Sequence, residues 1–458
     1  MTDHGTITLH RTLKIRHEAD VFVAGGGPAG IAAAVTAARQ GCRVVLVEGQ
    51  SCFGGMGTSG GLPFFCHFSD GVNFVAGGVG REILDRLWAA DGMGPTMARE
   101  QQRGVVYKIE VLKRVYDELI GDSGAVATLC TQCVGVEADG GTVEAVVCYG
   151  KSGLYAVKAH AYVDCTGDGD LCAWAGAPFE KGDRDGGLQA GTLCSVWADI
   201  DWAAANAAGH GMFKQQRHLS QALADGVFSI PDPHLPGMLP VGPRTGVGNI
   251  GHTYGVDATD ERSVTQGLIW GRKLLLEYER FYKEYLKGYE RMELVSTAAA
   301  LGVRETRRIM GDYVLGIEDF KKRAAFDDEI GRYCYPVDVH AAKPNAQEQE
   351  HFEHKFKKLR YGEGESYGIP YRVLTPHGLD NMLVAGRCVS TDRDMNGSIR
   401  VMPACFITGQ AAGMAAALMV QNRTDSRRVD VPRLQAKLAA MGAYVPNAAA
   451  IPARACAE

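Results

Sequence analysis

The sequence lacks several features that would assign it to a broad functional class. Lys and Arg do not exceed Asp and Glu, and the formal net charge is −5, so no basic surface indicates nucleic acid as a partner. The first residues are charged and contain no apolar core of a signal peptide. The most apolar stretch, 403–420, is interrupted by Thr408, Gly409, Gln410 and Gly413, which favours a buried helix over a membrane span.

Disulfide and metal-binding frameworks are also missing. The 13 cysteines are odd in number and irregularly spaced, as is typical of reduced thiols, so we expect a cytoplasmic protein without a metal site. Glycine, by contrast, is abundant, with 58 of 458 residues against a typical usage of roughly 7%. The glycines follow no three-residue period, which excludes collagen. They indicate tight turns or backbone lying against a ligand.

The N-terminal segment predicts a strand–helix–strand unit. Residues 20–25 form a short apolar run that ends in glycine, and residues 28–40 form an alanine-rich helical stretch closed by Gly41. Residues 43–48 form a second apolar run. This order within about thirty residues predicts parallel strands joined by a right-handed crossover.

The turn between the first strand and the helix carries the pattern G-x-G-x-x-G at Gly25, Gly27 and Gly30. The first glycine makes the tight turn, the second lets a pyrophosphate approach, and the third lets the helix pack on the strand. The helix N-terminus would then present free N–H groups to the phosphates. Glu48, at the end of the second strand, is placed to bind ribose hydroxyls, which favours a dinucleotide without a 2′-phosphate.

Two further features favour a flavin over a nicotinamide dinucleotide. Residues 54–61 form a second glycine cluster directly after Glu48, where a flavin enzyme must pass its backbone beside the cofactor. Thr166, Gly167 and Asp168 follow a predicted strand and resemble the turn by which flavoproteins return to the nucleotide domain.

These motifs occur in an order that resembles the FAD-dependent oxidoreductase family, a group of two-dinucleotide-binding-domain, glutathione-reductase-like flavoproteins. The resemblance extends over nearly the whole chain and includes the blocks 77–87, 163–170, 254–260, 301–315, 335–340, 367–390 and 397–418. It implies FAD as the cofactor, with the strand residue Val134 meeting the adenine through its backbone. The implied FAD contacts are Gly25, Gly27, Pro28, Ala29, Gly30, Glu48, Gly55, Met56, Val134, Thr166, Gly167, Asp168, Gly386, Arg387, Ser398, Ile399 and Val401.

The resemblance and the sequence pattern together predict an α/β fold with a Rossmann-like FAD-binding domain. We expect a parallel sheet and an antiparallel β-meander over 126–164 in that domain. The predicted parts are a discontinuous FAD-binding domain at 1–190 and 366–425, an inserted α+β substrate or cap domain at 191–365, and a C-terminal extension at 426–458. The insertion contains a charged amphipathic stretch at 264–288 that predicts a helix.

Hydride transfer to a flavin requires a substrate carbon over N5 and, for an alcohol or amine, a base that accepts a proton. His252, in a glycine-rich segment, is our first candidate for that base, and His377 is a second. Arg304 and Arg400 are candidates to hold an anionic group of the substrate. If residues 301–315 form a helix, Arg304 shares a face with Arg308. An ordinary structural role is the alternative for each residue.

We therefore expect a dehydrogenase or oxidase that takes a hydride from a small polar alcohol or amine, with oxygen or another carrier as electron acceptor. One alternative is a reductase of an activated C=C supplied by NAD(P)H or a partner protein. Another is a non-catalytic flavin-binding subunit of a complex. No second G-x-G-x-x-G follows a strand, which argues against a dedicated NAD domain. The sequence leaves the oligomeric state open, and a homo-oligomer is one option.

Overall fold

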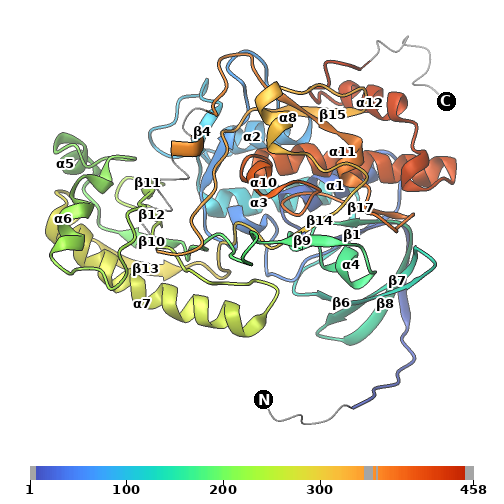
Figure 1. Cartoon of the computed structure of the whole chain (residues 1–458), viewed down its shortest axis with the longest axis horizontal. Helices are drawn as coiled ribbons and strands as arrows, with labels where there is room; N and C mark the ends of the chain where they lie inside the picture. The colour runs from blue at the N-terminus through green and yellow to red at the C-terminus, as the bar shows by residue number, and fades with distance from the viewer. Residues whose placement is uncertain (1–6, 345–353, 357–358, 449–458) are drawn as a thin grey trace.

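A mixed sheet with a parallel centre carries the nucleotide motifs in the computed structural model, which describes residues 7–344, 354–356 and 359–448 (Figure 1). The strand order is β5 (Val126–Thr128), β2 (Val44–Val47), β1 (Ile15–Ala24), β8 (Gly153–Asp164), β7 (Thr142–Gly150) and β6 (Gln132–Asp139), and β17 (Met382–Val384) also pairs with β8. β5, β2, β1, β8 and β17 are parallel, whereas β7 runs antiparallel to β8 and β6. The predicted Rossmann-like sheet and the predicted meander are therefore parts of one continuous sheet.

Two helices rich in small residues pack directly against each other on this sheet. α1 (Pro28–Arg39) follows β1, and α11 (Met402–Asn422) lies beside it (Figure 1). A Cβ atom at Gly409 or Gly413 would lie 2.2 Å from a backbone oxygen of α1, so glycine at these positions permits the close approach. α11 is long and apolar enough to span a membrane, but 94% of its apolar window is buried inside the protein. It is therefore a core helix, as the sequence predicts.

The insertion forms a separate body with its own hydrophobic core, at the left of Figure 1. Its antiparallel sheet has the order β11 (Gly237–Pro240), β12 (Gly246–Asn249), β10 (Ser195–Ala198) and β13 (Glu293–Thr297). The predicted amphipathic helix is α7 (Glu261–Tyr285), which buries Tyr278, Phe281 and Tyr282 against this sheet's core.

The chain after β13 returns to the main body earlier than residue 365. Phe320, Ile330 and Tyr333 belong to the main hydrophobic core rather than to the core of the insertion. β14 (Arg307–Ile309) pairs with β9 (Phe179–Lys181), and β15 (Glu329–Tyr333) pairs with β16 (Tyr367–Pro370). The arginine cluster at 304–308 does not lie on a helix, because Arg307–Ile309 form β14, whose hydrogen-bond partner is the distant strand β9.

The remaining helices and strands belong to the main body and to the insertion. α3 (Ile109–Ser123) is an amphipathic helix that buries Leu112, Val115 and Leu119. The other elements are β3 (Phe64–His67), α2 (Val79–Ala89), β4 (Arg103–Val106), α4 (Asp170–Trp174), α5 (Trp202–Ala207), α6 (Leu219–Ala224), α8 (Ile317–Lys322), α10 (Arg393–Ile399) and α12 (Val431–Ala440).

Candidate functional site

The three glycines of the first motif have different structural reasons to be glycine. Gly25 has φ 87°, and a Cβ there would lie 2.5 Å from the carbonyl oxygen of Cys165. A Cβ at Gly30 would lie 1.7 Å from the carbonyl oxygen of Gly25, so α1 packs on the turn only without a side chain. A Cβ at Gly27 would meet nothing within 4 Å. Gly27 therefore borders open space, where a ligand can approach the backbone.

That open space is a cavity of about 480 Å³ at the carboxyl ends of β1 and β8. The predicted cofactor residues that line it are Gly25, Gly27, Pro28, Ala29, Glu48, Gly55, Met56, Thr166, Gly167, Asp168, Gly386, Arg387 and Val401. The N-terminus of α11 also opens onto this cavity through Met402 and Cys405, and no side chain caps it. A helix N-terminus without a cap presents positive N–H groups, which suits a negatively charged ligand group.

Four predicted cofactor residues do not line the cavity. Gly30 lies beneath the turn, where it contacts Gly25. Ser398 and Ile399 are fully buried in α10, and the hydroxyl of Ser398 donates to the carbonyl of Tyr335 at 2.5 Å. The side chain of Val134 lies on β6 and is 47% exposed. Arg400 and Val401, which link α10 to α11, are the ones that reach the cavity wall.

Glu48 lies at the end of β2 with its carboxylate held by backbone groups. Oε2 accepts a hydrogen bond from the N–H of Gly26 at 2.6 Å, and Oε1 accepts one from the N–H of Gln50 at 2.7 Å. Burial raises the pKa of this carboxyl, and the backbone N–H donors oppose the rise. The carboxylate is thus fixed at the cavity wall as a hydrogen-bond acceptor, which fits ribose hydroxyls.

The return turn after β8 is shaped by the buried carboxylate of Asp164. Its Oδ1 accepts from the hydroxyl of Thr166 at 2.8 Å, and its Oδ2 accepts from the N–H of Cys172 at 2.9 Å. Asp168, on the cavity side of this turn, accepts from the guanidinium of Arg387 at 2.6 Å. The glycine cradle, the fixed carboxylate of Glu48 and the uncapped helix together fit a dinucleotide cofactor.

A second cavity of about 330 Å³ adjoins the first. The two cavities share a wall made of Met56, Leu62, Phe64, Cys66, Val303, Arg400 and Val401. The far wall of the second cavity belongs to the insertion and its flanking loops, through Thr192, His234 and Asn249. A molecule bound in the second cavity would therefore lie directly beside the dinucleotide.

Two buried guanidinium groups give the second cavity an excess of positive charge. Nη1 of Arg304 donates to the carbonyl of Ala190 at 2.5 Å and to Oγ1 of Thr192 at 3.1 Å. Burial, with Arg400 nearby, lowers the pKa of Arg304 to about 10, so the group stays charged at neutral pH. Nη2 of Arg400 pairs with Oδ2 of Asp338 at 3.1 Å. One carboxylate lines this cavity beside two guanidiniums, which favours an anionic ligand group.

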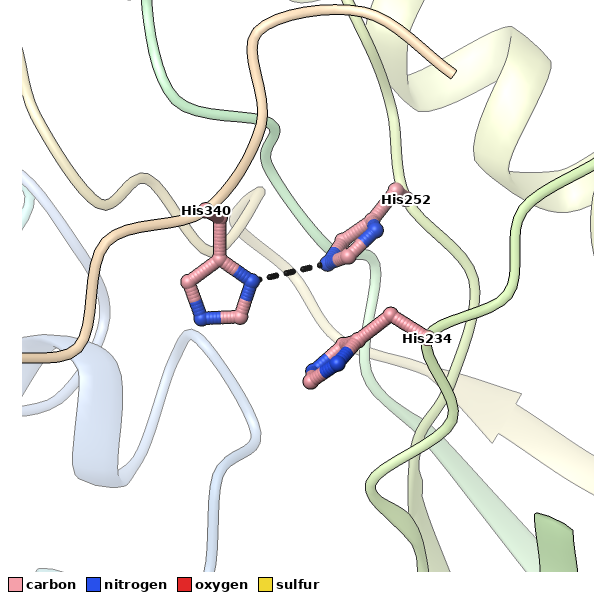
Figure 2. A group of neighbouring side chains, drawn as sticks. All are labelled: His234, His252 and His340. Carbon is pink, nitrogen blue, oxygen red and sulfur yellow. Dashed lines mark hydrogen bonds between the residues drawn. The ribbon is translucent and has the colours of Figure 1, made fainter. Parts of the chain in front are cut away.

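Three histidines gather at the edge of this cavity (Figure 2). His234 and His340 line the cavity, whereas His252 is buried behind them and does not line either cavity. Nε2 of His252 lies 3.1 Å from Nδ1 of His340, and Nδ1 of His252 lies 3.0 Å from Oδ2 of Asp232. Burial lowers the pKa of all three rings, that of His234 to about 4. The rings are therefore neutral at neutral pH.

Of the predicted catalytic residues, the structure brings Arg304 and Arg400 into the cavity and places His252 one ring behind it. His377 lies elsewhere, with a 53% exposed side chain beside Asp312, and lines neither cavity. The sequence reasoning missed His234 and His340. Both close an Asp-x-His triplet, 232–234 and 338–340, and this repeated triplet is the signal that would have pointed to them.

The comparisons with known proteins agree with this geometry. A family model described as FAD dependent oxidoreductase matches residues 20–438. The thiamine thiazole synthase of Methanothermobacter thermautotrophicus is 30% identical over 204 residues, which are 41% of this chain and 71% of that protein.

Solved structures of low sequence identity match most of the chain. A geranylgeranyl bacteriochlorophyll reductase-like protein from Thermoplasma acidophilum is 13% identical, with a TM-score of 0.47 over 93% of this chain and 83% of that one. The FAD-dependent myxobacterial chondrochloren halogenase is 13% identical, with a TM-score of 0.42 over 92% and 80%. Because the family model covers nearly the whole chain, the protein belongs to the FAD-dependent oxidoreductase family, and FAD is its cofactor.

Proposed function

We propose that this enzyme is a dehydrogenase or oxidase of a small substrate that carries a carboxylate beside an alcohol or amine. The observation that carries the proposal is the shared wall between the FAD cavity and a second, positively charged cavity. When bound, FAD supplies a hydride acceptor. The volume of about 330 Å³ suits a small organic acid rather than a polymer.

The two guanidinium groups would bind and orient the carboxylate of the substrate. Arg304 is fixed from behind by Ala190 and Thr192, so its remaining N–H groups keep a defined direction. Arg400 lies on the shared wall and therefore touches both cavities. Guanidinium groups bind a carboxylate through two parallel hydrogen bonds, and this geometry would hold the oxidisable carbon in one orientation.

The proton of the substrate hydroxyl or amine would leave on the histidine side of the cavity. His234 and His340 form that wall, and His252 supports His340 from behind at 3.1 Å. In this arrangement His252, our first candidate for the base, would not contact the substrate but would position the ring of His340. The electron acceptor, the oligomeric state and a cytoplasmic location stay predictions from the sequence.

Anaerobic reduction of the holoenzyme tests this proposal. The bound flavin is mixed with small 2-hydroxy and 2-amino acids and with uncharged alcohols and amines of similar size, and its visible absorbance is followed. We expect bleaching by acids and much slower bleaching by their uncharged counterparts. Bleaching by NAD(P)H but by no member of the panel would instead identify a reductase. Absence of bleaching by either, with a stably bound partner protein, would identify a flavin-binding subunit.

A further inference from the structure

The histidine cluster combines three side chains from three separate loops. His234 precedes β11, His252 follows β12, and His340 follows β15 (Figure 2). One ring nitrogen of each lies within 4.8 Å of a ring nitrogen of the other two. The rings of His234 and His252 are stacked at 5.1 Å, and the ring of His340 stands nearly perpendicular to both. Three imidazoles thus surround one point at the edge of the substrate cavity.

Two carboxylates, the buried Asp232 and the partly exposed Asp338, lie on the outer side of this cluster. Oδ2 of Asp232 is 3.0 Å from Nδ1 of His252, and Oδ2 of Asp338 is 3.3 Å from Nε2 of His340. A proton on the nitrogen that faces each carboxylate would leave the inner nitrogens of these two rings able to bind an ion. Those inner nitrogens are 3.1 Å apart. Without an ion, one of these two nitrogens donates a hydrogen bond to the other (Figure 2). A bound ion would take the place of that shared proton.

The same arrangement is typical of metal-binding histidines, which nearly always donate their outer N–H to a carboxylate, a carbonyl or water. We propose that His234, His252 and His340 bind one divalent transition-metal ion of the zinc, iron or cobalt kind. The ion would keep an open coordination position toward the substrate cavity. This assignment runs against our expectation from cysteine spacing, which could not detect a site built from three distant histidines.

The geometry needs a small closure to hold an ion. Three nitrogens bound tetrahedrally at about 2.0–2.1 Å lie about 3.3 Å from one another. The His252 and His340 nitrogens are already 3.1 Å apart, and the largest separation in the cluster is at most 4.8 Å. A shift of about 1.5 Å by the ring of His234 would therefore complete the set. His234 and His340 line the cavity and His252 lies behind them, so the fourth position faces the cavity.

The surrounding charges indicate what the open position would bind. Asp232 and Asp338 carry two negative charges near the cluster, and Arg304 and Arg400 carry two positive ones. A divalent ion adds two positive charges, so its remaining ligand should be an anionic oxygen. A carboxylate or deprotonated hydroxyl of the substrate meets this requirement, since a bound metal ion lowers the pKa of a hydroxyl. With the ring nitrogens bound to the ion, the proton of that hydroxyl would leave to water. The proposal that the ion binds the substrate rests on the proposed function, whereas the proposal that the three histidines bind an ion does not.

Metal titration of the holoprotein tests the site without any turnover. Protein treated with a chelator and desalted is titrated with Zn²⁺, and retained zinc is measured by elemental analysis after gel filtration. We expect one ion per chain in the unaltered protein and none in His234→Ala, His252→Ala or His340→Ala. His377→Ala should retain the ion, because this exposed histidine lies outside both cavities. FAD content and melting temperature, measured on each variant, report whether the fold is kept.

A positioning residue gives a graded second test. Asp232→Asn keeps the size of the side chain but weakens the contact with Nδ1 of His252, so affinity for Zn²⁺ should fall by about 10–100-fold. Where a histidine variant fails to fold, the Gln variant at that position replaces it, and Co²⁺ absorption reports nitrogen ligation. Failure of the unaltered protein to retain zinc, or equal retention in the histidine variants, overturns the metal site. Flavin reduction by a substrate in zinc-free protein overturns only the role of the ion, whereas zinc binding without such reduction overturns only the proposed reaction.

Discussion

Gly27 separates cofactor binding from protein stability more cleanly than any other position in the nucleotide motif. Its φ of −68° is open to alanine, and an added Cβ would touch no protein atom within 4 Å. The methyl group of Gly27→Ala would instead project into the FAD cavity, which Gly27 lines. We therefore expect the apoprotein to unfold at nearly the same urea concentration, with a change in free energy within about 0.5 kcal/mol.

The loss in FAD affinity can be worked from the same geometry. A methyl group here keeps the pyrophosphate away from the N–H groups of the first turn of α1. Hydrogen bonds to charged groups contribute about 1.5–3 kcal/mol each, so losing two at the lower value removes about 3 kcal/mol. This corresponds to a Kd for FAD that is about 150-fold higher. Titration of the apoprotein with FAD, followed by flavin fluorescence, measures it.

Substitutions at two other glycines serve as controls for the effect of Gly27→Ala on FAD affinity and stability. Gly121→Ala also adds a methyl group in open space, but on α3 and away from the cavity, so FAD affinity should not change. Gly30→Ala places its methyl group 1.7 Å from the carbonyl of Gly25, so stability and FAD affinity should both fall. Wild-type FAD affinity in Gly27→Ala would refute the reasoning, and so would a destabilised apoprotein.

Three further substitutions test the helix packing, the anion site and a surface ion pair. Gly413→Ala puts a methyl group 2.2 Å from the carbonyl of Ala33, and the free energy of unfolding should fall by about 1–3 kcal/mol in urea titrations. Arg304→Lys keeps the charge but loses the two-pronged donor geometry, so KM for a carboxylate substrate should rise by about 10-fold in steady-state kinetics, with a smaller change in kcat. Hydrogen bonds from Arg39 hold the pKa of the Glu82 carboxyl below its ordinary value, so this pair stabilises the fold above that value and the benefit is lost as pH falls through the lowered pKa. Glu82→Gln should therefore lower stability by up to about 1 kcal/mol at pH 7, and the difference from the unaltered protein should shrink in acid.

Each of these predictions has a matched control and a contradicting result. Gly121→Ala is the control for Gly413→Ala. If both variants have the same free energy of unfolding, α1 and α11 can move apart without a loss of stability, which contradicts the prediction. Arg372→Lys changes an exposed arginine paired with Asp328, so an equal rise of KM there would remove the anion site from Arg304. Asp85→Asn alters an exposed pair, and an equal, pH-independent loss there would contradict the assignment for Glu82→Gln.

The part of the fold that the sequence predicts best is the part whose signals are local. The β1–α1–β2 unit follows from apolar runs, small helix residues and a glycine turn that are all adjacent in the chain. The segment around Arg304 and Arg308 has no such local signals, because its conformation depends on pairing with β9, which is far away in the sequence. The shared helix face considered for Arg304 and Arg308 is therefore absent, because tertiary hydrogen bonding makes Arg307–Ile309 a strand.

The candidate site also contains residues that local motifs predict and residues that only the fold brings together. The glycine motifs and Glu48 could be predicted because each lines the first cavity through its own short stretch of chain. His252 was singled out by its glycine-rich surroundings, but its partner His340 lies 88 residues away along the chain. Only the packing of the insertion against the loop after β15 brings the two rings together. The Asp-x-His triplet could therefore mark His340 as a candidate but not as the partner of His252.

Asp338 joins the anion site to the histidine cluster through a single atom. Its Oδ2 lies 3.1 Å from Nη2 of Arg400 and 3.3 Å from Nε2 of His340. An anionic substrate that binds Arg400 competes with Asp338 for the same guanidinium, and any weakening of that pair leaves the carboxylate more fully available to His340. The proposed substrate would therefore change the contact that orients the ring of His340. If the proposed substrate binds there, the two cavities and the cluster would act as one site, although their residues come from the nucleotide domain, the insertion and the loop after β15.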